Sequence, residues 1–319
     1  MPLSMNTKHH LLILSQHDEI YKQLIACEQL PGLLVSAVKE PIKIVHTGEP
    51  IDIIFGEPSL ISEVLPNMPA VHWVQSTWAG VEPLLVPGMR QDYQLTNARN
   101  VYGQAMVEYV FGYLLMIERK ILVRWQSQLT EKWDNRPNGT LREKTLGLLG
   151  VGSIGSQLAN TAHDFGMQVF GYTRQSEDCP AVDRYFHGEE LTEFACGLDY
   201  LVCCLPGTPA TFHLINEGFL SSLPPKAWLL NIGRGSTIDE TALIRGLSDY
   251  QLAGAVLDVN AVEPLPAGHP LWSTPNTYLT FHSAAQNYPP DIAKIFIENY
   301  RRSIEGKPLL YQVDFIRGY

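Results

Sequence analysis

Residues 145–155 read TLGLLGVGSIG, and this stretch decides how the chain folds. The run 145–151 has the apolar composition of a buried strand, and residues 153–165 carry apolar side chains at helical spacing. A second apolar run, 168–172, follows at the distance expected of a βαβ unit. A Gly-x-Gly-x-x-Gly turn in this strand–helix setting is typical of a site that binds a dinucleotide.

The turn contains the residues that a pyrophosphate requires. Gly150 permits the tight turn, Gly152 lets the backbone approach the phosphates, and Gly155 lets the helix pack closely on the strand. We expect the free N–H groups at the helix start, around Ser153 and Ile154, to bind the phosphate oxygens. The alternative is an ordinary βα turn that binds no ligand.

The end of the second strand indicates which dinucleotide binds. A site for NAD(H) normally places Asp or Glu here, to accept a hydrogen bond from the ribose 2′-hydroxyl. This chain has Thr173, Arg174 and Ser176 instead. Because a guanidinium beside hydroxyl groups suits a 2′-phosphate, we expect NADP(H) to be preferred, with NAD(H) as the second choice. The alternative is that Arg174 is a solvated loop residue.

The rest of the chain alternates short strands with helices, which predicts α/β domains built on parallel sheets. Before the motif, strands are expected at 11–15, 42–46, 51–56 and 70–75, a helix at 18–30, and a longer helix from 104 to about 125. After it, strands are expected at 200–205, 228–232, 252–258 and 277–281, and a helix at 290–306 that returns to the first domain.

Composition and charge exclude several classes of protein. The formal net charge of −10 over 319 residues argues against binding of nucleic acid or a membrane surface. The five cysteines lack zinc-site spacing, so we expect no metal. The apolar stretch 11–14 is too short for a signal peptide, and the run 109–117 is too short to span a membrane. We therefore expect a cytoplasmic protein.

Three polar residues follow strand ends in the second half of the chain. Arg234 lies between two glycines after the strand at 228–232, and its planar guanidinium can hold a carboxylate or polarise a carbonyl. His282 follows the strand at 277–281 and can supply a proton near neutral pH. Glu263 lies in a proline-stiffened loop and can orient the imidazole. Taken alone, a histidine at a strand end is as often structural as catalytic. With Arg234 and the dinucleotide motif it predicts hydride transfer to a small anionic carbonyl compound.

Together these motifs resemble the D-isomer-specific 2-hydroxyacid dehydrogenase family. The resemblance is carried by the glycine motif and by the segments 79–81 (AGV), 205–208 (LPGT), 231–235 (NIGRG), 258–259 (DV), 263–265 (EPL) and 282–285 (HSAA). Within the family the chain is most like bacterial glyoxylate/hydroxypyruvate reductases. Residues 260–262 (NAV) depart from the charged residues that many members carry before the glutamate.

The resemblance implies two Rossmann-like, doubly wound parallel-sheet domains with a cleft between them. It assigns residues 1–98 and 289–319 to a substrate-binding domain and residues 99–288 to a dinucleotide-binding domain. It also implies a homodimer that uses the helix around 104–125. The catalytic residues would be Arg234, Glu263 and His282, and the substrate would also contact Ala79, Gly80 and Trp78, the last of which could equally have a packing role. Further cofactor contacts are implied for Leu205, Pro206, Thr208, Ile232, Gly233 and Asp258.

The function predicted from these features is NAD(P)H-dependent reduction of a small 2-oxo acid, glyoxylate or hydroxypyruvate, to the D-2-hydroxy acid. Two alternatives remain. One is a dehydrogenase of a bulkier 2-hydroxy acid such as 3-phosphoglycerate, which would need extra cations near Trp78 that the sequence lacks. The other is a non-catalytic, nucleotide-sensing corepressor or scaffold on the same fold.

Overall fold

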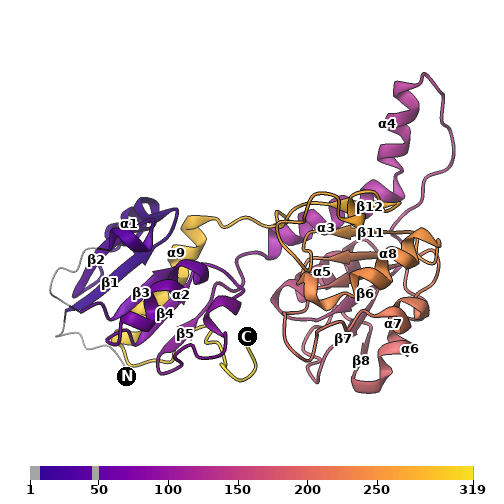
Figure 1. Cartoon of the computed structure of the whole chain (residues 1–319). Coiled ribbons are helices and arrows are strands. Elements are labelled where there is room, and N and C mark those ends of the chain that lie inside the picture. The colour runs from indigo at the N-terminus through magenta and orange to yellow at the C-terminus, as the bar shows by residue number, and fades with distance from the viewer. Residues whose placement is uncertain (1–7, 45–49, 319) are drawn as a thin grey trace. The chain divides into compact units, whose positions relative to one another are not determined.

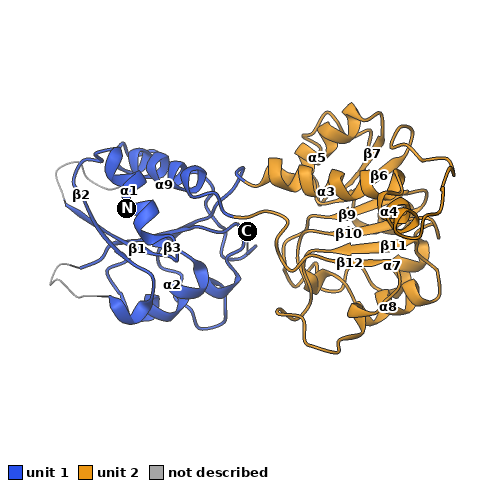
Figure 2. Cartoon of the chain, turned by 90° about the horizontal axis from the view of Figure 1, so that it is seen from above, with its two compact units in different colours: residues 1–101, 287–319 blue, residues 102–286 orange. Residues whose placement is uncertain are grey.

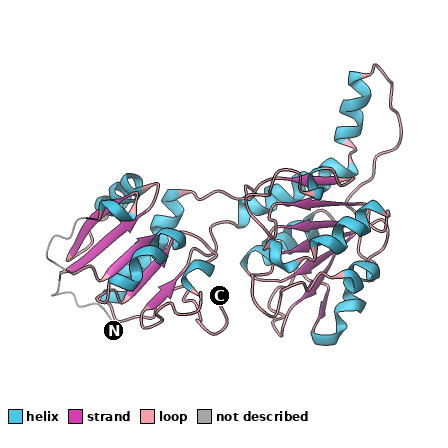
Figure 3. Ribbon diagram, viewed as in Figure 1, coloured by secondary structure: helices cyan, strands magenta, loops and turns pink. Residues whose placement is uncertain are grey.

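The chain divides into two compact units (Figure 2). Unit 1 comprises Met1–Val101 and Asn287–Tyr319, and unit 2 comprises Tyr102–Gln286. The structure is a computed structural model that describes residues 8–44 and 50–318. Strands and helices alternate through most of each unit, as Figure 3 shows.

Unit 1 is a parallel five-stranded sheet in the order β2-β1-β3-β4-β5. Helices α1 and α9 cover one face and α2 covers the other (Figure 2). The strands are β1 (His9–Leu14), β2 (Leu33–Val38), β3 (Ile53–Gly56), β4 (Trp73–Ser76) and β5 (Gln94–Thr96). The helices are α1 (Asp18–Cys27), α2 (Pro58–Val64) and α9 (Pro289–Ile304).

The C-terminal helix α9 is fastened to this sheet by aromatic stacking and by a buried polar network. The ring of Phe296 stacks on Trp73 and Phe55 at centroid distances of 5.2 and 5.1 Å. Beside them, the buried Gln75 Oε1 accepts a hydrogen bond from Asn299 Nδ2 at 3.0 Å. Because buried amides cost free energy unless they are paired, this network fixes which face of α9 meets the sheet.

Unit 2 is a parallel seven-stranded sheet in the order β12-β11-β10-β9-β6-β7-β8, with helices on both faces (Figures 1 and 2). The strands are β6 (Thr145–Leu149), β7 (Gln168–Tyr172), β8 (Arg184–Phe186), β9 (Tyr200–Cys203), β10 (Trp228–Asn231), β11 (Gly254–Leu257) and β12 (Thr277–Leu279). The helices are α3 (Gly103–Glu118), α4 (Ile121–Leu129), α5 (Ser153–Asp164), α6 (Leu191–Ala195), α7 (Glu217–Ser222) and α8 (Glu240–Ser248).

Each face of this sheet has its own apolar core. On one face, α3 and α5 bury residues such as Phe111 and Leu158 against the strands. On the other, α6, α7 and α8 bury residues such as Phe194, Phe219 and Leu243. A parallel sheet that is covered on both faces needs strands that are apolar on both sides, which explains the nearly continuous apolar runs in the sequence.

The predicted α/β fold with two parallel sheets is confirmed, and several predicted elements differ from the observed ones. The expected strand at 42–46 is wrong over its described part, because Pro41–Lys43 forms a 3-10 turn; residues 45 and 46 lie outside the described residues. The strand of this region is β2, whose apolar run Leu33–Val38 is only partly buried. Strands β5 and β8 were not predicted; they are three-residue edge strands without an apolar run.

The predicted helix from 104 to about 125 is two helices, α3 and α4. The chain breaks between them at Lys120, which has a left-handed backbone with φ 51°. No Gly or Pro marks this break. The returning loop holds it instead, because Lys120 Nζ donates to Pro137 O at 2.7 Å and Gly139 N donates to Glu118 O at 2.9 Å. Within the described residues, no helix is both long and apolar enough to cross a membrane.

Candidate active site

The predicted site residues of unit 2 follow the carboxyl ends of neighbouring strands. The strands are all parallel, so these ends share one edge of the sheet. Strand order reverses beside β6, with β7 on one side and β9 on the other. Open α/β sheets bind ligands outside the carboxyl ends of strands at such a point. The turns after β6, β7 and β9 to β12 therefore lie at the edge where a ligand is expected.

The glycine turn after β6 has the geometry of a phosphate cradle. Gly150 has φ +95°, which favours glycine, and a Cβ on Gly155 would overlap the carbonyl oxygen of Gly150. Gly152 is the N-cap of α5, and no side chain caps the helix there. A Cβ on Gly152 would meet nothing within 4 Å. The start of α5 is therefore uncapped and has open space beside Gly152, as a pyrophosphate that binds the first N–H groups of the helix requires.

The turn after β7 has more carboxylates than its first residues suggest. Thr173 Oγ1 donates to Ser176 O at 2.7 Å, which closes the turn, and Arg174 is exposed beside it. Ser176 Oγ donates to Asp178 at 2.7 Å. His187 Nε2 contacts Glu177 at 2.8 Å, and this contact, together with the backbone of Thr173, raises the pKa of His187 above its usual value. The turn is therefore a mixed-charge site around one guanidinium.

The loops after β9 and β10 lie against each other. Leu205, Pro206 and Thr208 are half-buried, and Thr211 Oγ1 donates to Pro206 O at 2.6 Å. After β10, Ile232 and Gly233 are buried, and a Cβ on Gly233 would lie 2.5 Å from Leu205 O. The backbones of these two loops are thus in contact, which brings together the residues that were predicted to contact the cofactor.

Two side chains fix the backbone of Arg234 at the end of β10. Its carbonyl oxygen accepts hydrogen bonds from Asn231 Nδ2 at 3.0 Å and Thr237 Oγ1 at 2.6 Å. Its Nη1 donates to Gly233 O at 2.7 Å, and the side chain is half-buried. The backbone is thus fixed while the guanidinium lies at the carboxyl edge of the sheet.

His282 and Glu263 form a carboxylate–imidazole couple. His282 Nδ1 lies 2.8 Å from Glu263 Oε2, and their side chains are 55% and 36% exposed. Because an ionised carboxylate can only accept, Nδ1 carries the hydrogen, which leaves Nε2 to exchange a proton with a ligand. The second oxygen of Glu263 accepts from Asn260 N at 2.9 Å. Both carboxylate oxygens are therefore engaged, and the imidazole is oriented.

The turn that carries His282 has an unusual backbone, which Asp258 holds in place. Phe281 and His282 are consecutive left-handed residues with φ 60° and 56°. Such conformations cost about 1–3 kcal/mol each and persist only where the surroundings enforce them. Here His282 N donates to Asp258 O at 2.6 Å, and Ser283 N donates to Asp258 Oδ1 at 2.8 Å. Asp258 is 1% exposed, so its carboxylate is part of the scaffold of this turn.

Two residues that the sequence patterns did not identify support Asp258. Thr280 Oγ1 donates to Asp258 Oδ1 at 2.6 Å, and Tyr109 on α3 lies 2.7 Å from the same hydroxyl. Since the hydrogen of Thr280 is given to Asp258, Tyr109 must be the donor to Thr280. Burial raises the pKa of Tyr109, which keeps it a donor. No motif links a residue of α3 with the end of β12, so only the folded chain reveals this relay.

The remaining predicted residues, Trp78, Ala79 and Gly80, lie in unit 1, in the loop after β4. Trp78 is 40% exposed, and its carbonyl accepts from Ser76 Oγ at 2.8 Å and from Ala98 N at 3.1 Å. Ala79 O accepts from Asn97 Nδ2 at 2.7 Å. Within the described part of the chain, the N–H groups of Ala79 and Gly80 make no hydrogen bond.

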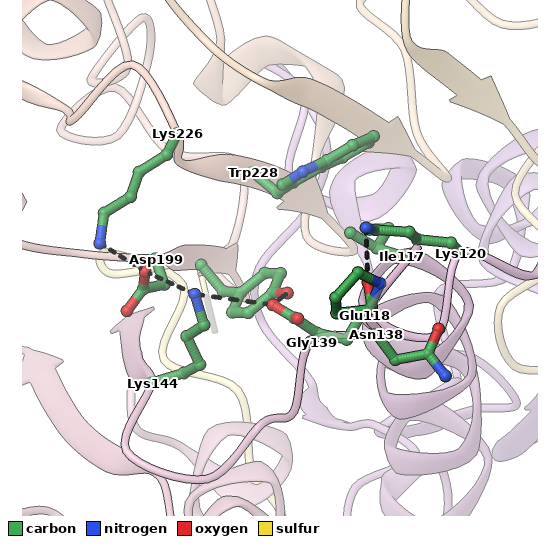
Figure 4. Close-up of a pocket in the computed structure, with 11 residues that line it drawn as sticks. Ile117, Glu118, Lys120, Asn138, Gly139, Lys144, Asp199, Lys226 and Trp228 are labelled. Atoms are coloured by element: carbon green, nitrogen blue, oxygen red, sulfur yellow. Dashed lines mark hydrogen bonds and ion pairs between the residues drawn. The ribbon is translucent and has the colours of Figure 1, made fainter. Parts of the chain in front are cut away.

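A cavity of about 300 Å³ in unit 2 is lined by none of the predicted site residues (Figure 4). It opens at the amino ends of β6, β9 and β10, and its polar lining is paired internally. Lys144 Nζ lies 3.2 Å from Asp199 and 3.7 Å from Glu118, and Lys226 Nζ lies 2.8 Å from Asp199. Burial alone would raise the pKa of Asp199, but hydrogen bonds from Lys226 and its neighbours lower it. This network ties strand ends together and is not the candidate site.

Comparison with known proteins agrees with the geometry. The sequence pattern of the D-isomer specific 2-hydroxyacid dehydrogenase, NAD binding domain matches residues 111–284. Glyoxylate/hydroxypyruvate reductase A of Klebsiella pneumoniae subsp. pneumoniae is 33% identical over 217 residues, which are 68% of this chain and 70% of that protein.

Two solved structures are similar over nearly their whole length. A D-isomer specific 2-hydroxyacid dehydrogenase family protein of Aeromonas salmonicida is 38% identical, with a TM-score of 0.90 over 97% of this chain and 99% of its own. A D-isomer specific 2-hydroxyacid dehydrogenase of Xanthobacter autotrophicus, in complex with NADPH and MES, is 30% identical, with a TM-score of 0.86 over 98% and 100%. The chain therefore belongs to the D-isomer specific 2-hydroxyacid dehydrogenase family.

Proposed function

We propose that this enzyme reduces a small 2-oxo acid, glyoxylate or hydroxypyruvate, to the D-2-hydroxy acid with NADPH. The observation that carries the proposal is the oriented His282–Glu263 couple, 2.8 Å apart, at the strand edge that also holds Arg234 and the glycine turn. The similarity to a glyoxylate/hydroxypyruvate reductase supports the substrate class. The short turn around Trp78 contains no Lys or Arg, which disfavours a phosphorylated substrate such as 3-phosphoglycerate.

The chemistry divides among three side chains. Arg234 binds the substrate carboxylate and polarises the ketone oxygen through its planar fork. When bound, the nicotinamide supplies the hydride that converts the ketone carbon to the alcohol carbon. His282 delivers a proton from Nε2 to the developing alkoxide, and Glu263 holds the ring through Nδ1 and stabilises its charge. The presence of both proton donor and anion anchor disfavours a non-catalytic scaffold.

The cofactor would be held by the turns of unit 2. The helix start at Ser153 and Ile154 would bind the pyrophosphate, and Thr173, Arg174 and Ser176 would face the adenosine ribose. Further contacts would come from Leu205, Pro206, Thr208, Ile232, Gly233 and Asp258. A preference for NADP(H) over NAD(H) rests on Arg174, and it is supported by the NADPH complex of the Xanthobacter relative.

The unpaired N–H groups of Ala79 and Gly80 suit a substrate carboxylate, so unit 1 would act as the substrate-binding unit and unit 2 as the dinucleotide-binding unit. Trp78 would limit the size of the group that the substrate carries on its carbonyl carbon.

We also propose a cytoplasmic location. All five cysteines are unpaired, which suits the reducing cytoplasm.

The test is steady-state reduction of a panel of 2-oxo acids with NADPH and with NADH. We expect the highest kcat/KM for glyoxylate or hydroxypyruvate with NADPH, and a lower value for branched or phosphorylated substrates. Arg174→Ala should raise KM for NADPH by roughly 10-fold or more, because a charged hydrogen bond is lost, and leave KM for NADH within about 2-fold. Equal effects on both cofactors would remove Arg174 from the specificity site, and no turnover of any 2-oxo acid would contradict the proposed function.

We further propose that the enzyme is a homodimer formed through α3 and α4. Helix α4 and the loop after it project from the rest of unit 2 (Figure 1). None of its nine residues is buried, and Trp125 and Leu129 are 55% and 63% exposed. An isolated helix of this length is marginal in water, so its apolar side chains need a cover.

Light scattering in solution tests this association. We expect a mass of twice 35.7 kDa for the native chain. The double variant Trp125→Asp, Leu129→Asp should shift the protein toward the monomer, since it places charge on the apolar face. Ile42→Asp, at an apolar residue of unit 1 that is 89% exposed, is the control and should not change the mass. A native chain of monomeric mass would disprove the dimer.

A further inference from the structure

A second carboxylate–imidazole pair, Glu240 and His269, lies behind the loop that carries Glu263. Glu240 is the first residue of α8, and its Oε1 accepts a hydrogen bond from Ala261 N at 2.7 Å. Its Oε2 lies 3.6 Å from His269 Nε2. The two side chains are 16% and 26% exposed, so this pair is more enclosed than the catalytic couple.

The orientation of His269 is fixed independently of Glu240. Its Nδ1 accepts from Leu271 N at 3.4 Å, as the N-cap of the 3-10 turn Pro270–Trp272. Because a ring nitrogen that accepts carries no hydrogen, the hydrogen of neutral His269 is on Nε2, which faces Glu240. The imidazole N–H therefore faces one oxygen of Glu240 at a distance too long for a hydrogen bond, while the other oxygen accepts from the backbone N–H of Ala261.

The loop of residues 260–263, to which Glu240 is hydrogen-bonded, also orients His282. Asn260 N, one residue before Ala261, donates to Glu263 Oε1 at 2.9 Å, and Glu263 Oε2 holds His282 at 2.8 Å. In addition, the backbone of Asn260 packs so closely on Gly235 that a Cβ there would overlap it. The loop is thus in contact with both the residue that follows Arg234 and the carboxylate of Glu240.

From these contacts we propose that Glu240 is a positioning residue for the Glu263–His282 couple. Glu240 acts through the amide of Ala261 and touches neither substrate nor cofactor. Asn260 is buried, but the residues that follow it, Ala261, Val262 and Glu263, are all exposed, so little else fixes this part of the loop. Without Glu240 the loop would sample other conformations, and the fraction of molecules in which Glu263 orients His282 would fall. The kinetic part of this inference rests on the proposed function.

The experiment compares Glu240→Ala and Glu240→Gln with the native enzyme. We expect Glu240→Ala to lower kcat for the best 2-oxo acid by about 10-fold, because a charge-assisted hydrogen bond is lost and the proton donor His282 is misplaced. KM for NADPH should stay within about 2-fold, since the glycine turn is untouched. Glu240→Gln should retain at least about a third of native kcat, because its amide oxygen can still accept from Ala261 N. His269→Ala should give a smaller loss in kcat.

Glu217→Ala is the matched control. Glu217 is the first residue of α7, as Glu240 is of α8, and it pairs with Arg245 at 3.5 Å on the surface. Both variants remove a carboxylate from a helix start, but only Glu240→Ala frees the loop. We expect native kcat in Glu217→Ala. A kcat of Glu240→Ala within about 2-fold of this control, or a Glu240→Gln as impaired as Glu240→Ala, would overturn the proposal.

Hydrogen–deuterium exchange separates this inference from the substrate assignment. The amide of Ala261 should exchange at least about 10-fold faster in Glu240→Ala than in the native chain, and near the native rate in Glu240→Gln. This measurement needs no substrate, so it remains decisive if the enzyme reduces none of the 2-oxo acids tested. An unchanged exchange rate at residues 258–263 would show that Glu240 does not hold the loop.

Discussion

The variant His282→Ala is expected to reduce 2-oxo acids with a kcat about 10²–10⁴-fold below that of the native enzyme, the range that a positioned general acid contributes. Without the imidazole the developing alkoxide must take its proton from water. The affinity for NADPH, measured by quenching of protein fluorescence, should stay within about 2-fold, because the cofactor's phosphates bind at the glycine turn after β6. A large loss of kcat with unchanged NADPH binding would place His282 at the reacting atoms.

His163→Ala is the control for this experiment, since His163 is an exposed histidine on α5. It should leave kcat unchanged. Glu263→Gln is the informative companion, because an amide can still accept from His282 Nδ1 but cannot stabilise an imidazolium. We expect this variant to lie between His282→Ala and the native enzyme. If His282→Ala retained kcat within about 3-fold of the native value, proton delivery would have to come from another group.

The second large effect is expected at Arg234. Arg234→Ala should lower kcat/KM for the 2-oxo acid by about 10²–10⁴-fold, because the substrate loses its charged anchor and the ketone its polarising group. Arg234→Lys should recover little of this loss, since an ammonium cannot form two parallel hydrogen bonds with a carboxylate. The loss should be in kcat as well as in KM, because the ketone oxygen becomes more negative in the transition state.

Arg245→Ala provides the comparison for Arg234. Arg245 is an arginine of α8, 59% exposed, that forms a surface ion pair with Glu217. Surface pairs of this kind contribute about 0–1 kcal/mol, so this variant should be close to native in both activity and stability. If Arg234→Lys were as active as the native enzyme, a point charge would suffice, and bidentate binding of the substrate would be disproved.

The parts of the fold that could be predicted are those written in short, local patterns. The β6–turn–α5 unit follows from an apolar run, three glycines and helical spacing within about twenty residues, and observed β7 has the predicted bounds Gln168–Tyr172. The α3–α4 break could not be predicted. The sequence there reads as one helix, and the contacts around the left-handed Lys120 come from residues 137–139, which return to bind Lys120 and Glu118.

The site shows the same division. That Arg234, Glu263 and His282 follow strand ends could be inferred, because parallel strands place their carboxyl ends at one edge. The conformation of the His282 turn could not, because it depends on Asp258, Thr280 and the distant Tyr109. The role proposed for Glu240 could not be inferred either. In the sequence it is only a residue at the start of a helix, whereas in the structure it accepts a hydrogen bond from the loop that carries Glu263.

By itself the sequence determined the fold class, the dinucleotide turn and the chemical character of the site, because each depends on residue type and spacing over a few positions. Only the tertiary structure decided through which atoms Glu263 orients the imidazole, what holds that carboxylate and what fixes the turn of His282. These are hydrogen bonds of 2.6–2.9 Å between residues up to 171 positions apart. No sequence pattern indicates such contacts, because the packing of whole helices and strands, and not the spacing along the chain, brings their partners together.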